Sequence, residues 1–465
     1  MKLKTTLFGQ TYSFRNVKDV LAKANEEKSG DILAGVAAES TVERVAAKAV
    51  LADMTLKDLR ENPVVPYEDD DITRADQDAV DDNVYRQIKH FTVGEFREFI
   101  LGANEGKLAA IRPGLTAEMV AGVTKLMSNM DLVYGAQKLP VEATCNTTIG
   151  RKGTLSSRLQ PNHATDDISG IMASLMEGVS YGVGDAVIGL NPAVDTIDSV
   201  ASILKEFKQF MDDWQLPTQN CVLAHVTTQM KILEKNMAPM DLMFQSLAGS
   251  EIASRAFGIN VALMDEAYAI MQERRSSTGP NFMYFETGQG SELSSDGHYG
   301  ADQLVMEARC YAFAKRYHPF LVNTVVGFIG PEYLYDGRQM IRAGLEDHFM
   351  GKLTGVPMGC DVCYTNHMLA DQNDLENLAM MLTMANCNYI MGIPGGDDVM
   401  LMYQTTSYHD VAALRSLSGK KTIEPFAQRM QELGIFDADG RLTAKAGDPS
   451  LFMKREHELC GRRAV

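Results

Sequence analysis

One short segment of the chain reads Asn281-Phe-Met-Tyr-Phe-Glu-Thr287, an apolar run that closes on polar side chains. Similar apolar runs recur with helical patterns between them, which is typical of βαβ units around a parallel sheet. The eight runs are 141–147, 186–191, 220–226, 259–265, 281–287, 321–328, 356–364 and 388–394. Eight such units predict an α/β fold, a closed (β/α)8 barrel of the TIM type.

The chain divides into three parts by pattern. Residues 1–135 are expected to be helical, with capping boxes at Thr55 to Asp58 and Thr92 to Glu95 and no convincing strand. Residues 136–435 are expected to form the barrel, and residues 436–465 a tail with a basic end. Helices are expected at 198–214, 238–257, 301–317, 337–353, 373–386 and 405–418.

The composition excludes several classes of partner and compartment. The chain has 465 residues and a formal net charge of −17, which would repel nucleic acid and anionic membrane surfaces. No long apolar run and no secretory leader pattern is present, and seven scattered cysteines do not suggest a disulfide framework. We therefore expect a soluble, cytoplasmic protein with reduced thiols.

An acidic stretch runs from Glu68 to Asp82. A calcium site is one hypothesis, but Asp69-Asp70-Asp71 lacks the alternating spacing and central glycine of an EF-hand loop. A solvated linker is the favoured interpretation.

Polar residues at the carboxyl ends of the expected strands are the first candidates for a site, because barrel active sites form at that end. Asn191, Glu286 and Asp361 stand there, and Arg158 and Gln160 fall on the loop expected after the first strand. Two carboxylates and one arginine in a dry pocket leave a surplus negative charge, which either raises a carboxyl pKa or requires a cationic ligand. A small ammonium compound would neutralise it.

The run that holds Asp361 also contains the pair Cys360 and Cys363. Residues three apart on a strand point to opposite faces, so the pair could bind one metal only if the backbone turned between them. We expect no metal site in the protein itself. Asp361 would point into the barrel mouth, either as a structural partner for a buried donor or as a functional group.

Other common site motifs are weak or missing. The glycine-rich loops at 288–291 and 392–398 fit neither dinucleotide-binding nor Walker A spacing, and turn chemistry explains the second as well as phosphate binding does. No metalloprotease HExxH motif or hydrolase GxSxG motif is present. A metal hydrolase and a serine hydrolase are therefore disfavoured.

Several longer motifs resemble the large (heavy) subunit of ethanolamine ammonia-lyase. They include Ser-Ser-Arg-Leu-Gln-Pro-Asn at 156–162, Gly-Leu-Asn-Pro at 189–192, Phe-Glu-Thr-Gly-Gln-Gly-Ser at 285–291 and Arg-Ala-Gly-Leu-Glu-Asp-His-Phe-Met-Gly-Lys-Leu at 342–353. The resemblance extends from about Val141 to Phe452.

The resemblance implies an adenosylcobalamin-dependent radical conversion of ethanolamine to acetaldehyde and ammonia in ethanolamine catabolism. It also implies a separate small (light) subunit, a homo-oligomer of large subunits and an association with bacterial microcompartments, although no encapsulation helix stands out. The substrate residues that it implies are Arg158, Gln160, Asn191, Glu286 and Asp361, of which Glu286, Asp361 and Arg158 would be catalytic. The cofactor residues that it implies are Pro192, Gln245, Ser246, Ser294 and Met400.

Two alternatives stay open at this point. The segment from Asp296 to Gly300 is similar to the cobalt-binding Asp-x-His-x-x-Gly motif of other cobalamin enzymes, but it is one residue too short and fits a loop better. The chain could also be a barrel-shaped assembly subunit without chemistry, given its helical amino-terminal segment and its basic tail. The convergence of Arg158, Glu286 and Asp361 on one barrel mouth speaks against that role.

Overall fold

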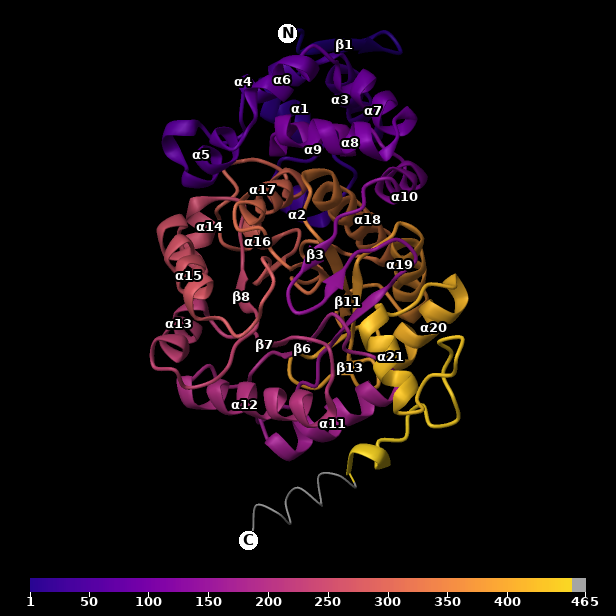
Figure 1. The fold of residues 1–465 in the computed structure, drawn as a ribbon. Helices are drawn as coiled ribbons and strands as arrows, with labels where there is room; N and C mark the ends of the chain where they lie inside the picture. Colours follow the sequence, from indigo (N-terminus) through magenta and orange to yellow (C-terminus); the bar gives the residue numbers. More distant parts are fainter. Residues whose placement is uncertain (454–465) are drawn as a thin grey trace. The chain divides into compact units, whose positions relative to one another are not determined.

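The computed structural model describes residues 1–453 and confirms the α/β barrel class (Figure 1). The central strands follow the order β7-β6-β5-β12-β11-β10-β9-β8, so β5, the first barrel strand, pairs with β12, the last. The pairs β5–β6, β6–β7, β10–β11 and β5–β12 are all parallel. The strands are β5 (Ser156–Leu159), β6 (Val187–Leu190), β7 (Asn220–Val222), β8 (Met243–Ser246), β9 (Met283–Thr287), β10 (Leu321–Gly327), β11 (Met358–Thr365) and β12 (Tyr389–Gly392).

The chain forms two compact units. Unit 1 contains Met1–Val141, Ser246–Glu266 and Phe285–Cys387, and unit 2 contains Glu142–Gln245, Ala267–Tyr284 and the described residues from Asn388 on. The division into residues 1–135, 136–435 and 436–465 stays a prediction.

The amino-terminal part of unit 1 is helical, as expected. Both capping boxes are confirmed: Thr55 caps α4 together with Asp58, and Thr92 caps α7 together with Glu95. The elements are α1 (Val17–Ala24), α2 (Ser29–Leu33), α3 (Thr41–Asp53), α4 (Leu56–Glu61), η1 (Tyr67–Asp69), α5 (Asp71–Asp78), α6 (Asp82–Ile88), α7 (Val93–Gly102), α8 (Glu105–Ile111), η2 (Arg112–Gly114), α9 (Ala117–Lys125) and α10 (Asn129–Gln137).

The expectation of no strand in this part was wrong. Strands β1 (Lys4–Leu7) and β2 (Gln10–Ser13) form an antiparallel hairpin. The two residues between them, Phe8 and Gly9, both have positive φ, which is the backbone geometry of a tight hairpin turn. Phenylalanine rarely adopts that conformation, so a turn was not expected at this position.

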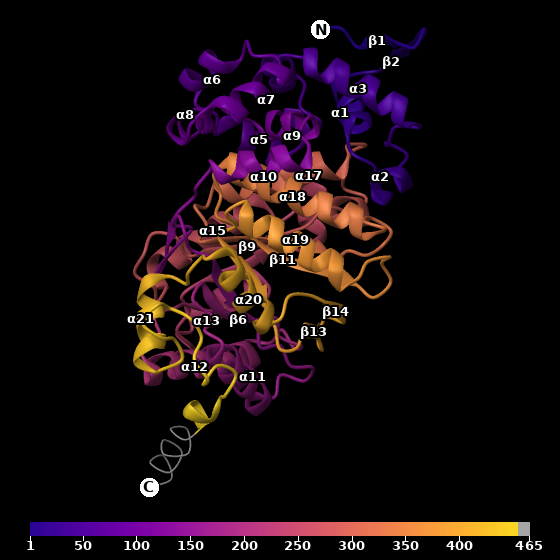
Figure 2. The ribbon, with the colours of Figure 1, turned by 90° about the vertical axis from the view of Figure 1, so that its right-hand side faces the viewer.

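The remaining helices of unit 1 include α18, which contacts α10, α17 and α19 (Figure 2). Helix α18 is buried along nearly its whole length, so its polar side chains need partners, as in the ion pair of Arg342 with Glu346 and the hydrogen bond from Lys352 to the Asn386 carbonyl. These helices are α14 (Glu251–Ala256), α16 (Ser291–Ser294), α17 (Gln303–Lys315), α18 (Gly337–Thr354) and α19 (Gln372–Met384).

Unit 2 has its own apolar core. At its far end Phe452 is fully buried and its ring contacts those of Trp214 and Phe210, with centroids 4.8 and 5.7 Å away. The helices are α11 (Ile168–Ser180), α12 (Ile197–Trp214), α13 (Val226–Glu234), α20 (Tyr408–Ser418) and α21 (Glu424–Glu432), while α15 (Val261–Arg274) runs from unit 1 into unit 2. The short strands are β3 (Ala143–Thr144), β4 (Thr148–Ile149), β13 (Asp397–Asp398) and β14 (Tyr403–Gln404).

Two expected barrel strands were wrong. The run 141–147 forms one side of the small β3–β4 hairpin, and β5 is the first barrel strand. The run 259–265 begins helix α15, where the side chain of Asn260 accepts a hydrogen bond from the backbone N–H of Leu263. The missing strand, β8, lies inside the helix expected at 238–257, because a short apolar run does not distinguish helix from strand.

The acidic stretch is not a solvated linker. Asp70 and Asp76 are buried, and the Asp70 carboxylate caps α5 by accepting from the backbone N–H of Thr73 at 2.7 Å. Asp70 also forms an ion pair of 2.7 Å with buried Arg309 on α17. An ion pair with a residue far away in the sequence allows an acidic side chain that would otherwise be solvated to be buried in the core.

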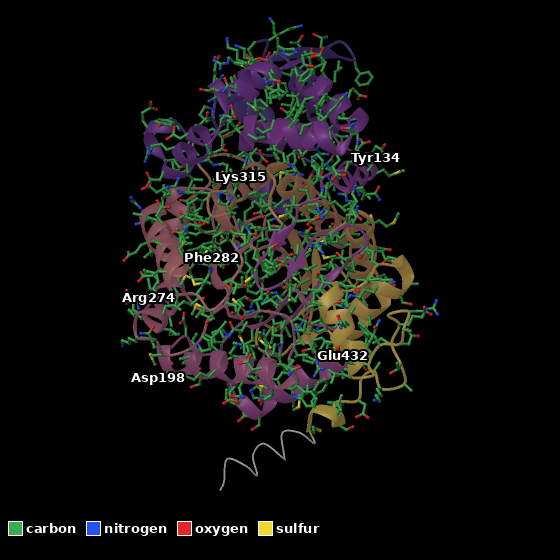
Figure 3. All side chains as sticks on the ribbon, in the orientation of Figure 1. Tyr134, Asp198, Arg274, Phe282, Lys315 and Glu432 are labelled. Carbon is green, nitrogen blue, oxygen red and sulfur yellow. The ribbon has the colours of Figure 1, made fainter. Side chains whose placement is uncertain are left out.

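Asp76 provides a pH-dependent prediction. Burial and the neighbouring Glu118 carboxyl raise the pKa of Asp76 to about 7, although Arg309 and Lys315 (labelled in Figure 3) partly offset this. The folded chain then binds a proton that the unfolded chain has lost, so stability falls as the pH rises from about 4 to about 7. We expect Asp76→Asn to change the free energy of unfolding little at pH 4. At pH 8 we expect it to stabilise the chain by up to roughly 1.4 kcal/mol for each pH unit between the unfolded and the folded pKa of Asp76. Urea unfolding of both proteins at the two pH values measures this, and an equal difference at both would contradict it.

Within residues 1–453, no helix is both long and apolar enough to cross a membrane. The basic side chains predicted for the tail, Lys454, Arg455, Arg462 and Arg463, lie outside the described residues.

Candidate functional site

Three polar side chains of unit 1 share one face of neighbouring strands. On the other face, Thr287 of β9 donates to Glu307 of α17, and Thr324 of β10 donates to Asp347 of α18 at 2.8 Å. Because side chains alternate along a strand, Glu286 and Asn323 point away from these helices. Val325 pairs with Asp361 in the register of β10 and β11, so Asp361 lies on that same face.

Asn323 connects directly to Glu286. Its amide nitrogen donates to the Glu286 carboxylate at 3.3 Å, and its side chain is fully buried. Its amide oxygen, Oδ1, has no hydrogen-bond partner within the described part of the chain. A buried acceptor without a donor costs free energy, so this oxygen is suited to accept from a bound polar molecule.

The carboxyl groups on the opposite face are structural. Burial and the nearby Asp347 carboxyl raise the pKa of Glu307 well above its ordinary value, and burial raises the pKa of Asp347 to about 7. Glu307 accepts from the Tyr311 hydroxyl at 2.6 Å, and Asp347 accepts from the Gln289 amide at 2.7 Å. Through Thr287 and Thr324, these carboxyl groups connect strands β9 and β10 to helices α17 and α18.

Unit 2 brings the other three predicted substrate residues together. Arg158 lies within β5, not on the loop expected after it, because the first barrel strand is later than the sequence indicated. The Arg158 guanidinium is fully buried and donates to Gln160 Oε1 and to the hydroxyl of Tyr284. The side-chain amide of Asn191 donates to the same Gln160 oxygen at 3.3 Å.

A buried carboxylate, Asp398, orders the rest of this cluster. Its Oδ2 accepts from the side-chain amides of Gln160 at 3.2 Å and Asn162 at 2.7 Å. Its Oδ1 accepts from the backbone N–H groups of Met400 at 2.9 Å and Leu401 at 2.7 Å. Asp398 thus ties a predicted substrate residue, Gln160, to the loop that carries Met400. The glycine-rich loop around it is centred on a carboxylate, not on phosphate-binding groups.

The five predicted cofactor residues are distributed over both units. In unit 2, Pro192 follows β6 and is half-buried, Met400 is half-buried, and buried Gln245 accepts from the backbone N–H of Val226 at 2.9 Å. In unit 1, Ser246 ends β8 and is half-buried, and exposed Ser294 ends α16 and donates to the Ser291 carbonyl at 2.7 Å.

The potential metal ligands are scattered. Cys360 and Cys363 are both buried free thiols, and burial raises the pKa of Cys360 well above its ordinary value. His298 binds its own loop through the carbonyl of Ala301 at 3.0 Å. Over residues 1–453, no group of three His, Cys, Asp or Glu side chains is placed to hold a metal ion.

Comparison with known proteins identifies the family. The model of the ethanolamine ammonia lyase large subunit family (EutB) matches residues 12–445. The chain belongs to the ethanolamine ammonia-lyase large-subunit family. It is 56% identical over 454 residues to the ethanolamine ammonia-lyase large subunit of Escherichia coli K12, covering 97% of this chain and 100% of that protein.

The same subunit of Salmonella typhimurium LT2 is 55% identical over 454 residues, with the same coverage of both chains. A crystal structure of Plasmodium falciparum HPPK-DHPS has a TM-score of only 0.40 and 11% identity, over 76% of this chain and 65% of that one. That likeness is too weak to bear on fold or function.

Four further buried polar residues contact the residues that the ethanolamine ammonia-lyase resemblance implies, and none of the four was predicted from the sequence. Tyr284 and Asn323 could have been found, because each occupies an inward position on a strand that was correctly predicted. Asn162 and Asp398 gave no such signal, because their roles depend on loops that meet only in the folded unit.

Proposed function

We propose that the chain is the catalytic large subunit of an adenosylcobalamin-dependent ethanolamine ammonia-lyase, which converts ethanolamine to acetaldehyde and ammonia in ethanolamine catabolism. Membership of the ethanolamine ammonia-lyase large-subunit family over nearly the whole length is the observation that carries the proposal. The buried Arg158 cluster and the polar face of Glu286 and Asp361 would supply the groups that bind this substrate.

The two carboxylates, Glu286 and Asp361, would hold the substrate's ammonium group. Ethanolamine is a cation at neutral pH, and a carboxylate away from bulk water attracts it far more strongly than it would in water. Asp361 is almost fully buried and Asn323 restrains one oxygen of Glu286, so both acceptors would be oriented before the substrate arrives. The burial of Asp361 would also help to keep water from the reaction.

The substrate's hydroxyl would contact Arg158, while Gln160 and Asn191 fix its angle. The Arg158 side chain is already held by Gln160 and Tyr284, so its charge needs no reorganisation when charge develops on the substrate during migration of the amino group. Asp398 accepts a hydrogen bond from Gln160, and this contact would help to hold the Arg158 guanidinium in place.

The proposed cofactor residues are chemically suited to cobalamin. Pro192, Gln245, Ser246, Ser294 and Met400 are all uncharged, as are the amide groups around the corrin ring, and cobalt arrives already held by that ring. When bound, adenosylcobalamin supplies the radical hydrogen transfer that this reaction requires. The chain's own residues would bind and orient the substrate and exclude water.

The proposed partner is the small subunit of the same enzyme, which would complete the cobalamin site, and large subunits would form a homo-oligomer. We place the assembly in the cytoplasm, in a bacterial microcompartment where the organism makes one. The test is an omission assay in which acetaldehyde is measured with the chain, the small subunit, adenosylcobalamin and ethanolamine, and then with each component left out. Product only in the complete mixture is the expected result, and product without the small subunit would contradict the divided cofactor site.

A further prediction concerns Asn323, which we expect to position Glu286. Asn323→Ala should lower kcat more than it raises KM, by about tenfold, because losing one hydrogen bond of this kind costs roughly 1.4 kcal/mol. Steady-state kinetics on the two-subunit enzyme measure the split. Thr324→Val on the opposite strand face is the control, and an equal loss of kcat in both variants would show a merely structural role.

A further inference from the structure

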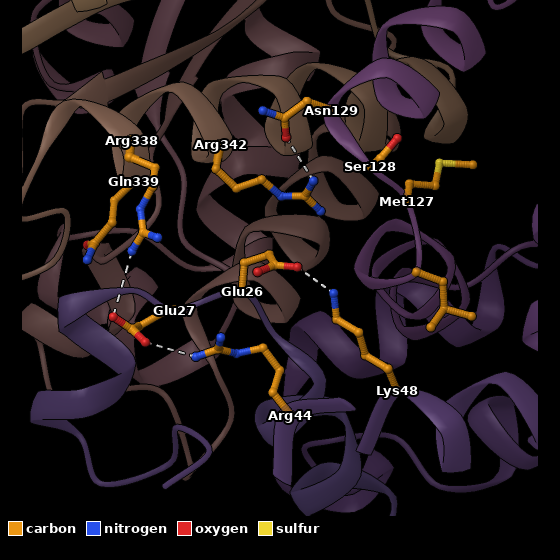
Figure 4. A pocket seen from close by; sticks show the side chains of 11 residues that line it. Glu26, Glu27, Arg44, Lys48, Met127, Ser128, Asn129, Arg338, Gln339 and Arg342 are labelled. Carbon is orange, nitrogen blue, oxygen red and sulfur yellow. Dashed lines mark hydrogen bonds and ion pairs between the residues drawn. The ribbon is translucent and has the colours of Figure 1, made fainter. Parts of the chain in front are cut away.

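A cavity of about 440 Å³ in unit 1 lies apart from the polar face described above (Figure 4). It is lined by the chain after α1, by α3, by the start of α10 and by the first turns of α18. We call it the basic pocket. Its lining residues are Glu26, Glu27, Arg44, Lys48, Leu126, Met127, Ser128, Asn129, Arg338, Gln339 and Arg342.

The lining has an excess of positive charge. Four cationic side chains face the cavity with only two carboxylates, although the whole chain has a net charge of −17. Lys48 pairs with Glu26, while Glu27 is shared between Arg44 at 3.1 Å and Arg338 at 3.8 Å. The two carboxylates therefore leave two positive charges without a counter-charge in the lining.

Helix stability does not explain this arrangement. Arg44 and Lys48 are four residues apart on α3, and Arg338 and Arg342 are four residues apart on α18. Like charges at that spacing repel one another and destabilise a helix slightly. Both pairs nevertheless lie toward the same cavity in Figure 4.

The buried layer below the pocket holds Arg342 without neutralising it. Arg342 donates to Glu346 at 2.6 Å, but Glu346 also pairs with fully buried Lys28 at 2.8 Å, so one carboxylate serves two cations. Burial opposes ionisation of Glu346, yet Lys28 and Arg342 outweigh it and lower its pKa to about 2. Glu346 therefore stays ionised and is shared between the two cations.

The pocket also contains an unused hydrogen-bond donor. The Nε of Arg44 is buried and has no hydrogen-bond partner within residues 1–453. The amino-terminal ends of α10 and α18 border the same cavity, and the carboxylates of Asp131 and Asp336 already cap them. The guanidinium groups and the spare N–H therefore carry the argument, and they favour a ligand with charged oxygens.

We propose that the basic pocket binds a small molecule with two negative charges on oxygen, of the phosphate-ester or diphosphate class. Two negative charges match the excess in the lining, and the volume suits a ligand larger than a single inorganic phosphate. The inference goes beyond the proposed function and does not depend on it, since none of these residues is assigned to substrate or cofactor.

The test is isothermal titration of the full chain with inorganic pyrophosphate as the probe. We expect one site per chain and a Kd at least about tenfold weaker in Arg338→Gln and in Lys48→Gln, since a charge-assisted hydrogen bond contributes roughly 1.5 kcal/mol or more. Arg15→Gln is the matched control: it removes one charge from a side chain that is 83% exposed, compared with 75% for Arg338, and lies outside the lining. Its Kd should not change.

Two results would overturn the proposal. One is no saturable binding at millimolar pyrophosphate, or binding that Arg338→Gln, Lys48→Gln and Arg15→Gln weaken equally, which would indicate general attraction to surface charge. The other is a change in oligomer size with Arg338→Gln, measured by light scattering, without any pyrophosphate binding to the parent chain. That result would assign the pocket to contact with a second copy.

Discussion

Replacing Glu286 with glutamine is expected to lower kcat of the two-subunit enzyme by about 10³-fold or more while the chain stays folded. The substitution keeps the size of the side chain and an acceptor for the amide of Asn323, but it removes the negative charge that would hold the substrate's ammonium group. The half-buried position of Glu286 at the end of β9 makes the change tolerable for the fold.

The measurement is acetaldehyde production at saturating ethanolamine, with circular dichroism to confirm folding. Glu332→Gln is the control, because it makes the same chemical change at an exposed position of unit 1 and should leave kcat unchanged. Activity retained within a few-fold of the parent in Glu286→Gln would remove Glu286 from the proposed chemistry.

The largest effect on stability is expected from Arg309→Met. Arg309 is fully buried on α17 and bonds Asp70 at 2.7 Å, Glu118 at 3.3 Å and the carbonyl of Gly249 at 2.7 Å. Removing it leaves two buried carboxylates without their counter-charge, which should lower the free energy of unfolding by about 3–5 kcal/mol.

Urea unfolding at pH 7 measures this loss. Arg316→Met is the comparison, since Arg316 forms an exposed pair with Asp265 at 2.9 Å that should contribute less than about 1 kcal/mol. Similar unfolding midpoints for the two variants would show that the buried network around Arg309 does not stabilise unit 1.

Strong local patterns predicted much of the fold. The runs that became β9, β10 and β11 are apolar and flanked by clear helical signals, and the capping boxes at Thr55 and Thr92 begin real helices. The strand Met243–Ser246 was missed because its few apolar residues resemble a turn of a buried helix. The burial of Asp70 was not predicted, because its partner, Arg309, lies 239 residues away in the sequence.

The candidate site shows the same division. Glu286, Asp361 and Asn191 were expected from their places at strand ends. Arg158 and Gln160 were expected on the loop after the first strand, but Arg158 lies within a strand. Asp398 could not be predicted, because two of its donors, Gln160 and Asn162, are 238 and 236 residues away in the sequence and meet it only after folding.

The most direct test of the proposed function is to incubate the chain with its small subunit, adenosylcobalamin and ethanolamine under anaerobic conditions and to quantify both products. We expect acetaldehyde and ammonia in equal amounts, with turnover lost in Glu286→Gln. If a folded complex that has bound both cofactor and small subunit releases neither product, the assignment of this chemistry to Glu286, Asp361 and Arg158 is wrong.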